Sequence, residues 1–213
     1  METKSKHIQD LSKIKSMMER SSRFLSLSGL SGISAGIIAM TGAAIAHYIL
    51  VLDQAKYDEF FPLLYFIYPP TGIDTIMPLF FLGVSVLFLA LASGLYFSWR
   101  KARKHGLPLW DHTTKRILTH LFIPLIAGGI FVLILINSNA DSLVASATLI
   151  FYGLALVNAG KYTLGEIHYL GIFEIILGIL AGIFINYGLL FWAMGFGVLH
   201  IVYGSVMYFR YER

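Results

Sequence analysis

The most chemically distinctive residues of the chain are two ionisable side chains within its last long apolar stretch. Glu174 and His200 lie at similar separations before and after a turn predicted over residues 186–188. At ~1.5 Å per residue each lies roughly 20 Å from that turn, so two antiparallel helices would bring them to one depth. A carboxylate beside an imidazole inside a membrane can carry a proton or bind a cation. Tyr203 follows His200 on nearly the same helical face and could join this network.

Both side chains also lie on stripes of small residues, which membrane helices use to bring their backbones close. The stripes consist of Gly171, Gly178, Ala181 and Gly182 around Glu174, and of Ala193, Gly197 and Gly204 around His200. We therefore expect both groups to face protein and the last two helices to press together. Two interpretations stay open for the pair: a functional proton or cation site, and a buried hydrogen-bonded pair that only fixes helix register.

A second polar set is predicted near the inner boundary of the membrane. It consists of His120, Asn158 and His168. The two histidines lie about equally far before their respective outer turns, so they should share one level, and Glu166 is close in sequence. Two histidines at one level could ligate a metal or a b-type haem. The alternative is that these residues are interfacial and hydrated.

A third set, at the outer boundary, consists of His47, Asp53 and Asp74. Interfacial solvation accounts for all three, and together with the aromatic segment 60–70 they could form an outer vestibule. No enzyme signature accompanies these sets: HExxH, GxSxG and a phosphate-binding Gly-Lys loop are all missing from the sequence. The chain has no cysteine, which excludes disulfides and thiolate chemistry. The sequence does not predict an enzyme.

The elements that must position these residues are membrane-spanning helices. Apolar residues make up 57% of the chain and charged residues only 13%, whereas soluble domains carry roughly 25% charged residues. The pattern predicts an all-α polytopic membrane protein with one domain of six transmembrane helices in three antiparallel hairpins. The predicted spans cover about 27–51, 73–99, 117–136, 142–160, 167–185 and 189–209.

Positive charge predicts the orientation of these spans. With both termini in the cytoplasm, fifteen of the sixteen Lys and Arg residues lie inside and only Lys56 lies outside. We therefore expect a plasma membrane protein of the bacterial inner-membrane type. Residues 1–26 read as a basic amphipathic segment that binds anionic lipid headgroups. The alternative is an ordinary cytoplasmic extension that orients the protein. The clustering of basic residues beside apolar runs favours orientation by positive charge over binding to nucleic acid.

Three functional hypotheses follow. The leading one is a small-solute or ion transporter or channel, proton-linked, centred on Glu174 and His200. The second is a non-catalytic membrane sensor, scaffold or accessory subunit, acting as a homo-oligomer or with a membrane partner. The third is a haem- or metal-binding redox protein that uses two of its histidines, with His120 and His168 as the first choice.

Overall fold

A computed structural model describes residues 28–55, 75–104 and 112–213. The predicted amphipathic segment 1–26, the aromatic segment 60–70 and Asp74 lie outside the described residues, as does the side chain of Asp53. The regular elements of the described residues are all helical. Only a helix satisfies its backbone hydrogen bonds within a single segment, which the apolar interior of a bilayer requires.

Six helices of the described residues are long and apolar enough to cross a membrane, which confirms the predicted all-helical class and number of spans. The first five contain α2 (Gly29–Ala55), α4 (Ile76–Lys104), α5 (His112–Asn137), α6 (Val144–Ala159, preceded by η1, Asp141–Leu143, and followed by η2, Gly160–Tyr162) and α7 (Gly165–Ile183). The last span is composite and runs through η3 (Ile185–Tyr187), α8 (Gly188–Trp192), η4 (Ala193–Leu199) and α9 (His200–Tyr211).

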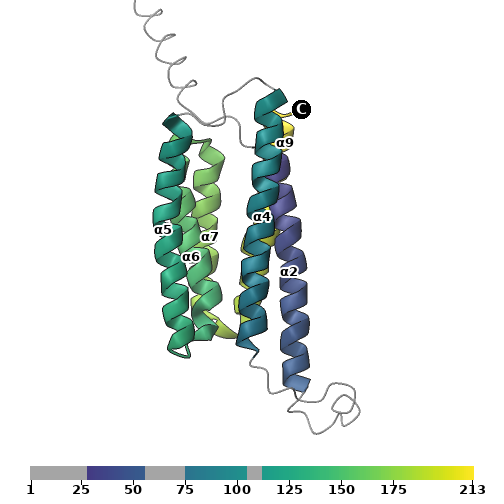
Figure 1. Cartoon of the computed structure of the whole chain (residues 1–213), viewed down its shortest axis with the longest axis vertical. Coiled ribbons are helices and arrows are strands. Elements are labelled where there is room, and N and C mark those ends of the chain that lie inside the picture. Colours follow the sequence, from purple (N-terminus) through teal and green to yellow (C-terminus); the bar gives the residue numbers. More distant parts are fainter. Residues whose placement is uncertain (1–27, 56–74, 105–111) are drawn as a thin grey trace, which may run out of the picture.

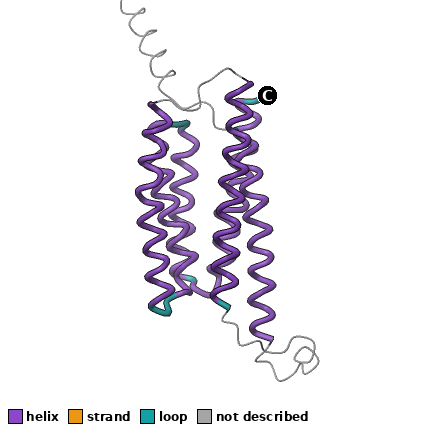
Figure 2. The backbone as a smooth tube through the Cα atoms, viewed as in Figure 1, coloured by secondary structure: helices purple, strands orange, loops and turns teal. Residues whose placement is uncertain are grey.

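The helices assemble into two groups, as Figure 1 shows. The α6 group contains α5, α6 and α7, and α6 packs against both neighbours. The α2 group contains α4, α2 and α9, with α2 packed against both of the others. Short connections hold the α6 group together (Figure 2), and the turn after α5 uses Asn139 in the left-handed backbone region, with φ 54°. The chain passes from the α2 group to the α6 group between α4 and α5, and returns through η3 and α8.

Glycines permit the close packing within each group. In the α6 group, Gly171 of α7 lies against Gly153 and Val157 of α6, where an added Cβ would overlap backbone atoms. In the α2 group, Gly32 and Gly36 of α2 lie against the backbone of the last span in the same way. The predicted Gly32-x-x-x-Gly36 pair thus packs inside the molecule.

This packing limits the contact between the last two spans, which were expected to press together. The glycines of α7 face α6, whereas Gly197 and Gly204 of the last span face α2. The two stripes of small residues therefore pack against different helices. The α7 helix and the last span contact each other mainly through α8 and η4, and little along α9. A stripe of small residues predicts close packing but does not identify the partner helix.

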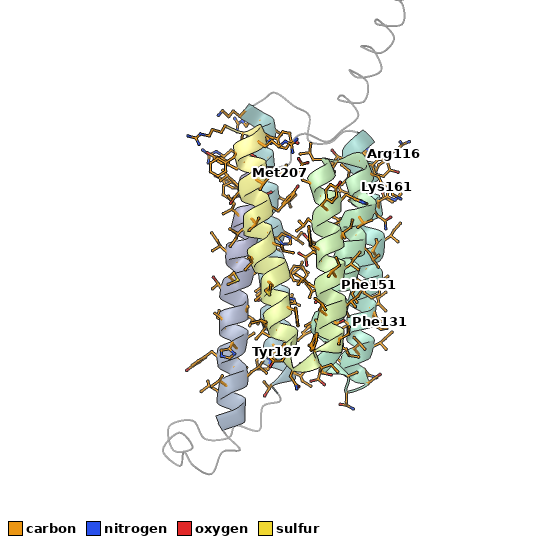
Figure 3. All side chains as sticks on the ribbon, turned by 180° about the vertical axis from the view of Figure 1, so that it is seen from behind. Arg116, Phe131, Phe151, Lys161, Tyr187 and Met207 are labelled. Carbon is orange, nitrogen blue, oxygen red and sulfur yellow. The ribbon has the colours of Figure 1, made fainter. Side chains whose placement is uncertain are left out.

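The described basic residues gather at one end of the molecule, which we call the basic end. Figure 3 shows Arg116 and Lys161 there, together with Met207, and Tyr187 at the opposite end, which we call the Tyr187 end. The set consists of Arg100, Lys101, Arg103, Lys104, Lys115, Arg116, Lys161, Arg210 and Arg213. At the same end Glu166 of α7 accepts a hydrogen bond from Arg210 Nη1 of α9 at 2.8 Å.

Candidate functional site

The structure brings Glu174 and His200 together between the two helix groups. Glu174 lies midway along α7, and His200 is the first residue of α9. The His200 Nδ1 and Glu174 Oε1 atoms are 3.4 Å apart. Glu174 is fully buried and His200 is 7% exposed. The two groups therefore meet although their helices pack mainly on other partners.

Hydrogen bonds fix the tautomer of the His200 ring. Nδ1 lies 3.0 Å from the Gly195 carbonyl oxygen, and Nε2 lies 2.8 Å from the Tyr152 hydroxyl. A carbonyl can only accept, so Nδ1 must carry the proton that it donates to Gly195. In the neutral ring Nε2 then accepts from the Tyr152 hydroxyl. Both nitrogens of His200 are therefore satisfied without any contribution from Glu174.

The carboxyl group of Glu174 is left without a hydrogen bond. Both of its oxygens are buried and neither has a partner among the described residues, because the Nδ1 proton of His200 is directed at Gly195. A buried ion without compensation is costly. Three partners could neutralise the carboxylate here: a proton of its own, a protonated His200, or a small cation.

An irregular turn of the last span creates room for this carboxyl group. Residues Ala193–Leu199 form a π-helix, the wide turn that is frequent at functional sites. Gly195 lies in this turn and faces α7 and α6: a Cβ there would overlap Glu174 Oε2 and the side chain of Leu149. The same residue supplies the carbonyl that orients His200. Gly195 thus positions both members of the pair.

Aromatic rings cover the other side of His200. Phe196 stacks on the imidazole with ring centroids 6.0 Å apart, and the Tyr152 ring lies 5.5 Å from it. Trp192 extends this row by its contact with Phe196, at 5.0 Å. The row separates the imidazole from its surroundings, and the negative faces of such rings suit a protonated imidazole as well as a neutral one.

Tyr203, which the sequence places near the pair, lies one helical turn from His200 toward the basic end. Its hydroxyl is buried and has no hydrogen-bond partner among the described residues. Its ring packs against a buried apolar cluster formed by Leu156, Ile167 and Leu170. The structure shows no hydrogen bond from Tyr203 to Glu174 or His200.

The residues of the predicted inner-boundary set contact different partners and do not form one cluster. His120 Nε2 lies 3.1 Å from the Tyr162 hydroxyl, and the two rings stack. His168 contacts Tyr169 edge-on and lies against Gly160, while Asn158 is half-buried on α6. No cluster of three or more His, Asp or Glu side chains suited to a metal occurs within the described part of the chain. His47, from the outer set, is exposed on α2.

Sequence reasoning missed two residues that build the site. Tyr152 supplies the partner of His200 Nε2, and Gly195 supplies both the carbonyl and the space for Glu174. A signal existed for Tyr152, because a phenol in the middle of a span needs a hydrogen-bond partner. Gly195 gave no separate signal among the many glycines of the last two spans.

Comparisons with protein-family models, with curated proteins and with solved structures find no match to this chain. What can be said of function therefore depends on the residues and their geometry.

Proposed function

We propose that this protein moves a small solute or ion across a membrane in a proton-linked cycle, with Glu174 and His200 as the proton-carrying pair. The six apolar helices are compatible with an integral membrane protein. The observation that carries the proposal is the fully buried carboxyl group of Glu174, which has no hydrogen bond and lies 3.4 Å from an imidazole. Ionisable groups at such depth are expensive and are characteristic of ion and proton pathways.

The arrangement provides two states that differ by the position of one proton. In one state Glu174 is neutral and His200 is neutral, with Nδ1 donating to Gly195. In the other state the proton lies on Nε2 of His200, where the Tyr152 hydroxyl turns to accept it, and the carboxylate compensates the imidazolium across the 3.4 Å contact. Because Nδ1 already carries a proton, Nε2 takes up its proton from the Tyr152 side while Glu174 releases its own. A cation could replace the proton beside Glu174. Exchange of these partners is the chemical step of a proton-linked transport cycle.

The proposal extends to orientation. The described basic residues gather at one end, and cytoplasmic loops of membrane proteins carry an excess of Lys and Arg. We infer that the basic end faces the cytoplasm and that both termini lie there. The same charge would hold this end near anionic headgroups.

Proton flux in proteoliposomes tests the proposal. Purified protein is reconstituted with a trapped pH-sensitive dye, and proton movement is followed after imposing a membrane potential or gradients of Na⁺, K⁺ and simple organic ions. We expect the wild type to move protons with at least one of these gradients and Glu174→Gln to lose this movement. Tyr169→Phe, on an exposed face of α7, is the matched control and should behave as the wild type does.

Equal proton flux in the wild type and in Glu174→Gln would contradict the proposal. The pair would then act as a register-fixing contact, the interpretation that the fully satisfied nitrogens of His200 favour. A non-catalytic sensor or accessory subunit would become the better account of the protein.

A further inference from the structure

We propose that the Glu174–His200 pair is reached from the basic end only, through the seam between α7 and α9, and that the Glu166–Arg210 ion pair latches this seam. The inference rests on the proposed function and names the side and route of proton access. We define the α7–α9 seam by its facing residues, which are Glu166, Leu170 and Glu174 on α7 and His200, Tyr203 and Arg210 on α9.

Toward the Tyr187 end, close backbone packing closes the site. Gly178 of α7 lies against Ile150 and Leu149 of α6, and its carbonyl accepts a hydrogen bond from Ser146 Oγ at 2.7 Å. Leu149, fully buried, also fills the space in front of Gly195. Between α7 and the last span, this side is closed by α8 and η4, which contact α7 more extensively than α9 does.

Toward the basic end, side chains alone hold α7 and α9 together. Leu199 and Tyr203 of the last span pack against the cluster that contains Ile167 and Leu170. Side chains can change rotamer where packed glycine backbones cannot move independently. The seam can therefore open with each helix group intact, because α7 and α9 make few contacts along their length.

The buried hydroxyl of Tyr203 is a further indication that water can reach Glu174 from the basic end. It has no hydrogen-bond partner among the described residues, although it lies between Glu174 and the basic end. Buried polar groups are normally paired with protein or with ordered water. Water that enters an opened seam would satisfy this hydroxyl and carry a proton from the bulk to the unpartnered oxygens of Glu174.

The latch lies where the seam meets the surface. Glu166 Oε1 accepts hydrogen bonds from Arg210 Nη1 and from the Tyr211 hydroxyl, both at 2.8 Å. The side chain of Arg210 is 65% exposed and that of Glu166 is 19% exposed. Ion pairs exposed to this degree contribute little to stability. The bond can therefore open and close readily while it still keeps water out of the closed seam.

The chain has no cysteine, so single cysteines can be labelled without background. Leu199→Cys reports on the seam, and Leu149→Cys is the matched buried control on the closed side. Each variant is reconstituted in vesicles and treated with a small membrane-impermeant thiosulfonate from one side at a time. We expect Leu199→Cys to react from the side of the basic end at least about tenfold faster than from the other side, because only that side opens. Leu149→Cys should stay unreactive from both sides.

A reversible lock tests the latch. Glu166→Cys and Arg210→Cys are combined with Leu199→Cys, and a short cleavable bifunctional thiol reagent joins the two surface cysteines first. We expect the link to suppress labelling of Leu199→Cys by about tenfold, and reductive cleavage of the link to restore it. The Glu166→Cys, Arg210→Cys double variant, which keeps Leu199, should lose proton flux when its two cysteines are linked. Arg210→Cys alone is the control that forms no link.

The outcomes separate the two proposals. Labelling of Leu199→Cys from the side of the Tyr187 end, or no faster than that of Leu149→Cys, overturns the access route. So does unchanged labelling after the link has formed. If Leu199→Cys does not fold, as judged by its thermal unfolding, Tyr203→Cys takes its place under the same criteria. The expected labelling in a protein without proton flux supports the route and contradicts the transport function.

Discussion

At the scale of residues, the two members of the site differ in the hydrogen bonds that they make. His200 has a hydrogen-bond partner for each ring nitrogen, whereas neither oxygen of Glu174 has one among the residues that the structure describes. Tyr152 and Gly195 are responsible for this difference, since they hold the imidazole proton away from the carboxyl group. The residues around His200 thus leave the carboxyl group of Glu174 without a hydrogen bond from that ring.

Replacing Tyr152 by Phe tests the contribution of its hydrogen bond to His200. In Tyr152→Phe the Nε2 atom of a buried imidazole loses its 2.8 Å partner, and an unsatisfied buried group costs about 1–3 kcal/mol. We expect a lower midpoint of thermal unfolding in detergent than for the wild type. Tyr169→Phe, whose ring is 65% exposed, is the control and should not change the midpoint. A Tyr152→Phe variant as stable as the wild type would show that the hydrogen bond does not order the ring.

Adding a single methyl group at Gly195 should disturb the pair directly. The new Cβ would overlap Glu174 Oε2 and Leu149, and overpacking of this kind costs about 1–3 kcal/mol. We expect Gly195→Ala to unfold at lower temperature and to lose proton flux. Gly129→Ala is the matched control, because no atom lies within 4 Å of a Cβ there. Equal stability of the two variants would contradict the role given to Gly195.

The sequence predicted the pair but only part of its surroundings. Glu174 and His200 stood out because charged and titratable residues are rare within apolar spans. Tyr152 and Gly195 did not, because their roles depend on which helices face each other. A similar depth of His120 and His168 in the membrane was a prediction from their spacing. The contact of His120 with Tyr162 could not be predicted in this way, because it depends on the course of η2.

At the scale of elements, the π-helix and the glycine faces decide which helices meet. The apolar lengths predicted six helices long and apolar enough to cross a bilayer, and the described residues contain six such helices. These lengths did not predict that the last span would pack mainly on α2. Which two helices pack together depends on the fit between the surfaces of both. The residue pattern of one helix describes its own surface and does not show which other helix fits it.

The crossing of α2 and α9 should be sensitive to size at Gly32. A Cβ at this position would overlap Gly204 Cα, so Gly32→Leu should separate the two helices. We expect loss of the folded protein, or a cost of at least about 3 kcal/mol, measured by thermal unfolding and by resistance to proteolysis. Gly83→Leu on α4 has open space around it and serves as the control. Tolerance of Leu at Gly32 would mean that this crossing does not stabilise the α2 group.

At the scale of the whole molecule, the two helix groups are joined at three levels. They are joined through η3 and α8 at the Tyr187 end, through Glu174 and His200 in the middle, and through Glu166 and Arg210 at the basic end. The chain also connects the groups covalently between α4 and α5, whose consecutive ends lie at the basic end. The contacts in the middle and at the basic end are polar, which is the property on which the proposed opening depends.

The C-terminus adds a polar contact within the α2 group. Glu212 accepts hydrogen bonds from Ser28 Oγ and from the Gly29 backbone N–H at the start of α2, and pairs with Lys101 of α4 at 3.4 Å. A carboxylate at a helix N-terminus satisfies orphan donors and the helix dipole. We expect Glu212→Ala to reduce stability by about 1–2 kcal/mol, in line with the loss of a helix cap. An unchanged unfolding midpoint, relative to Arg213→Ala as control, would exclude this capping role.

The central claim is that Glu174 exchanges a proton inside the membrane domain, and infrared difference spectroscopy measures this most directly. Protein reconstituted in lipid is titrated with pH, and the carboxylic acid C=O band is recorded for the wild type and for Glu174→Gln. We predict a band that changes with pH in the wild type, is shifted by replacing the solvent with D₂O, and is missing from Glu174→Gln. Identical spectra for the two proteins across the titration would contradict the claim.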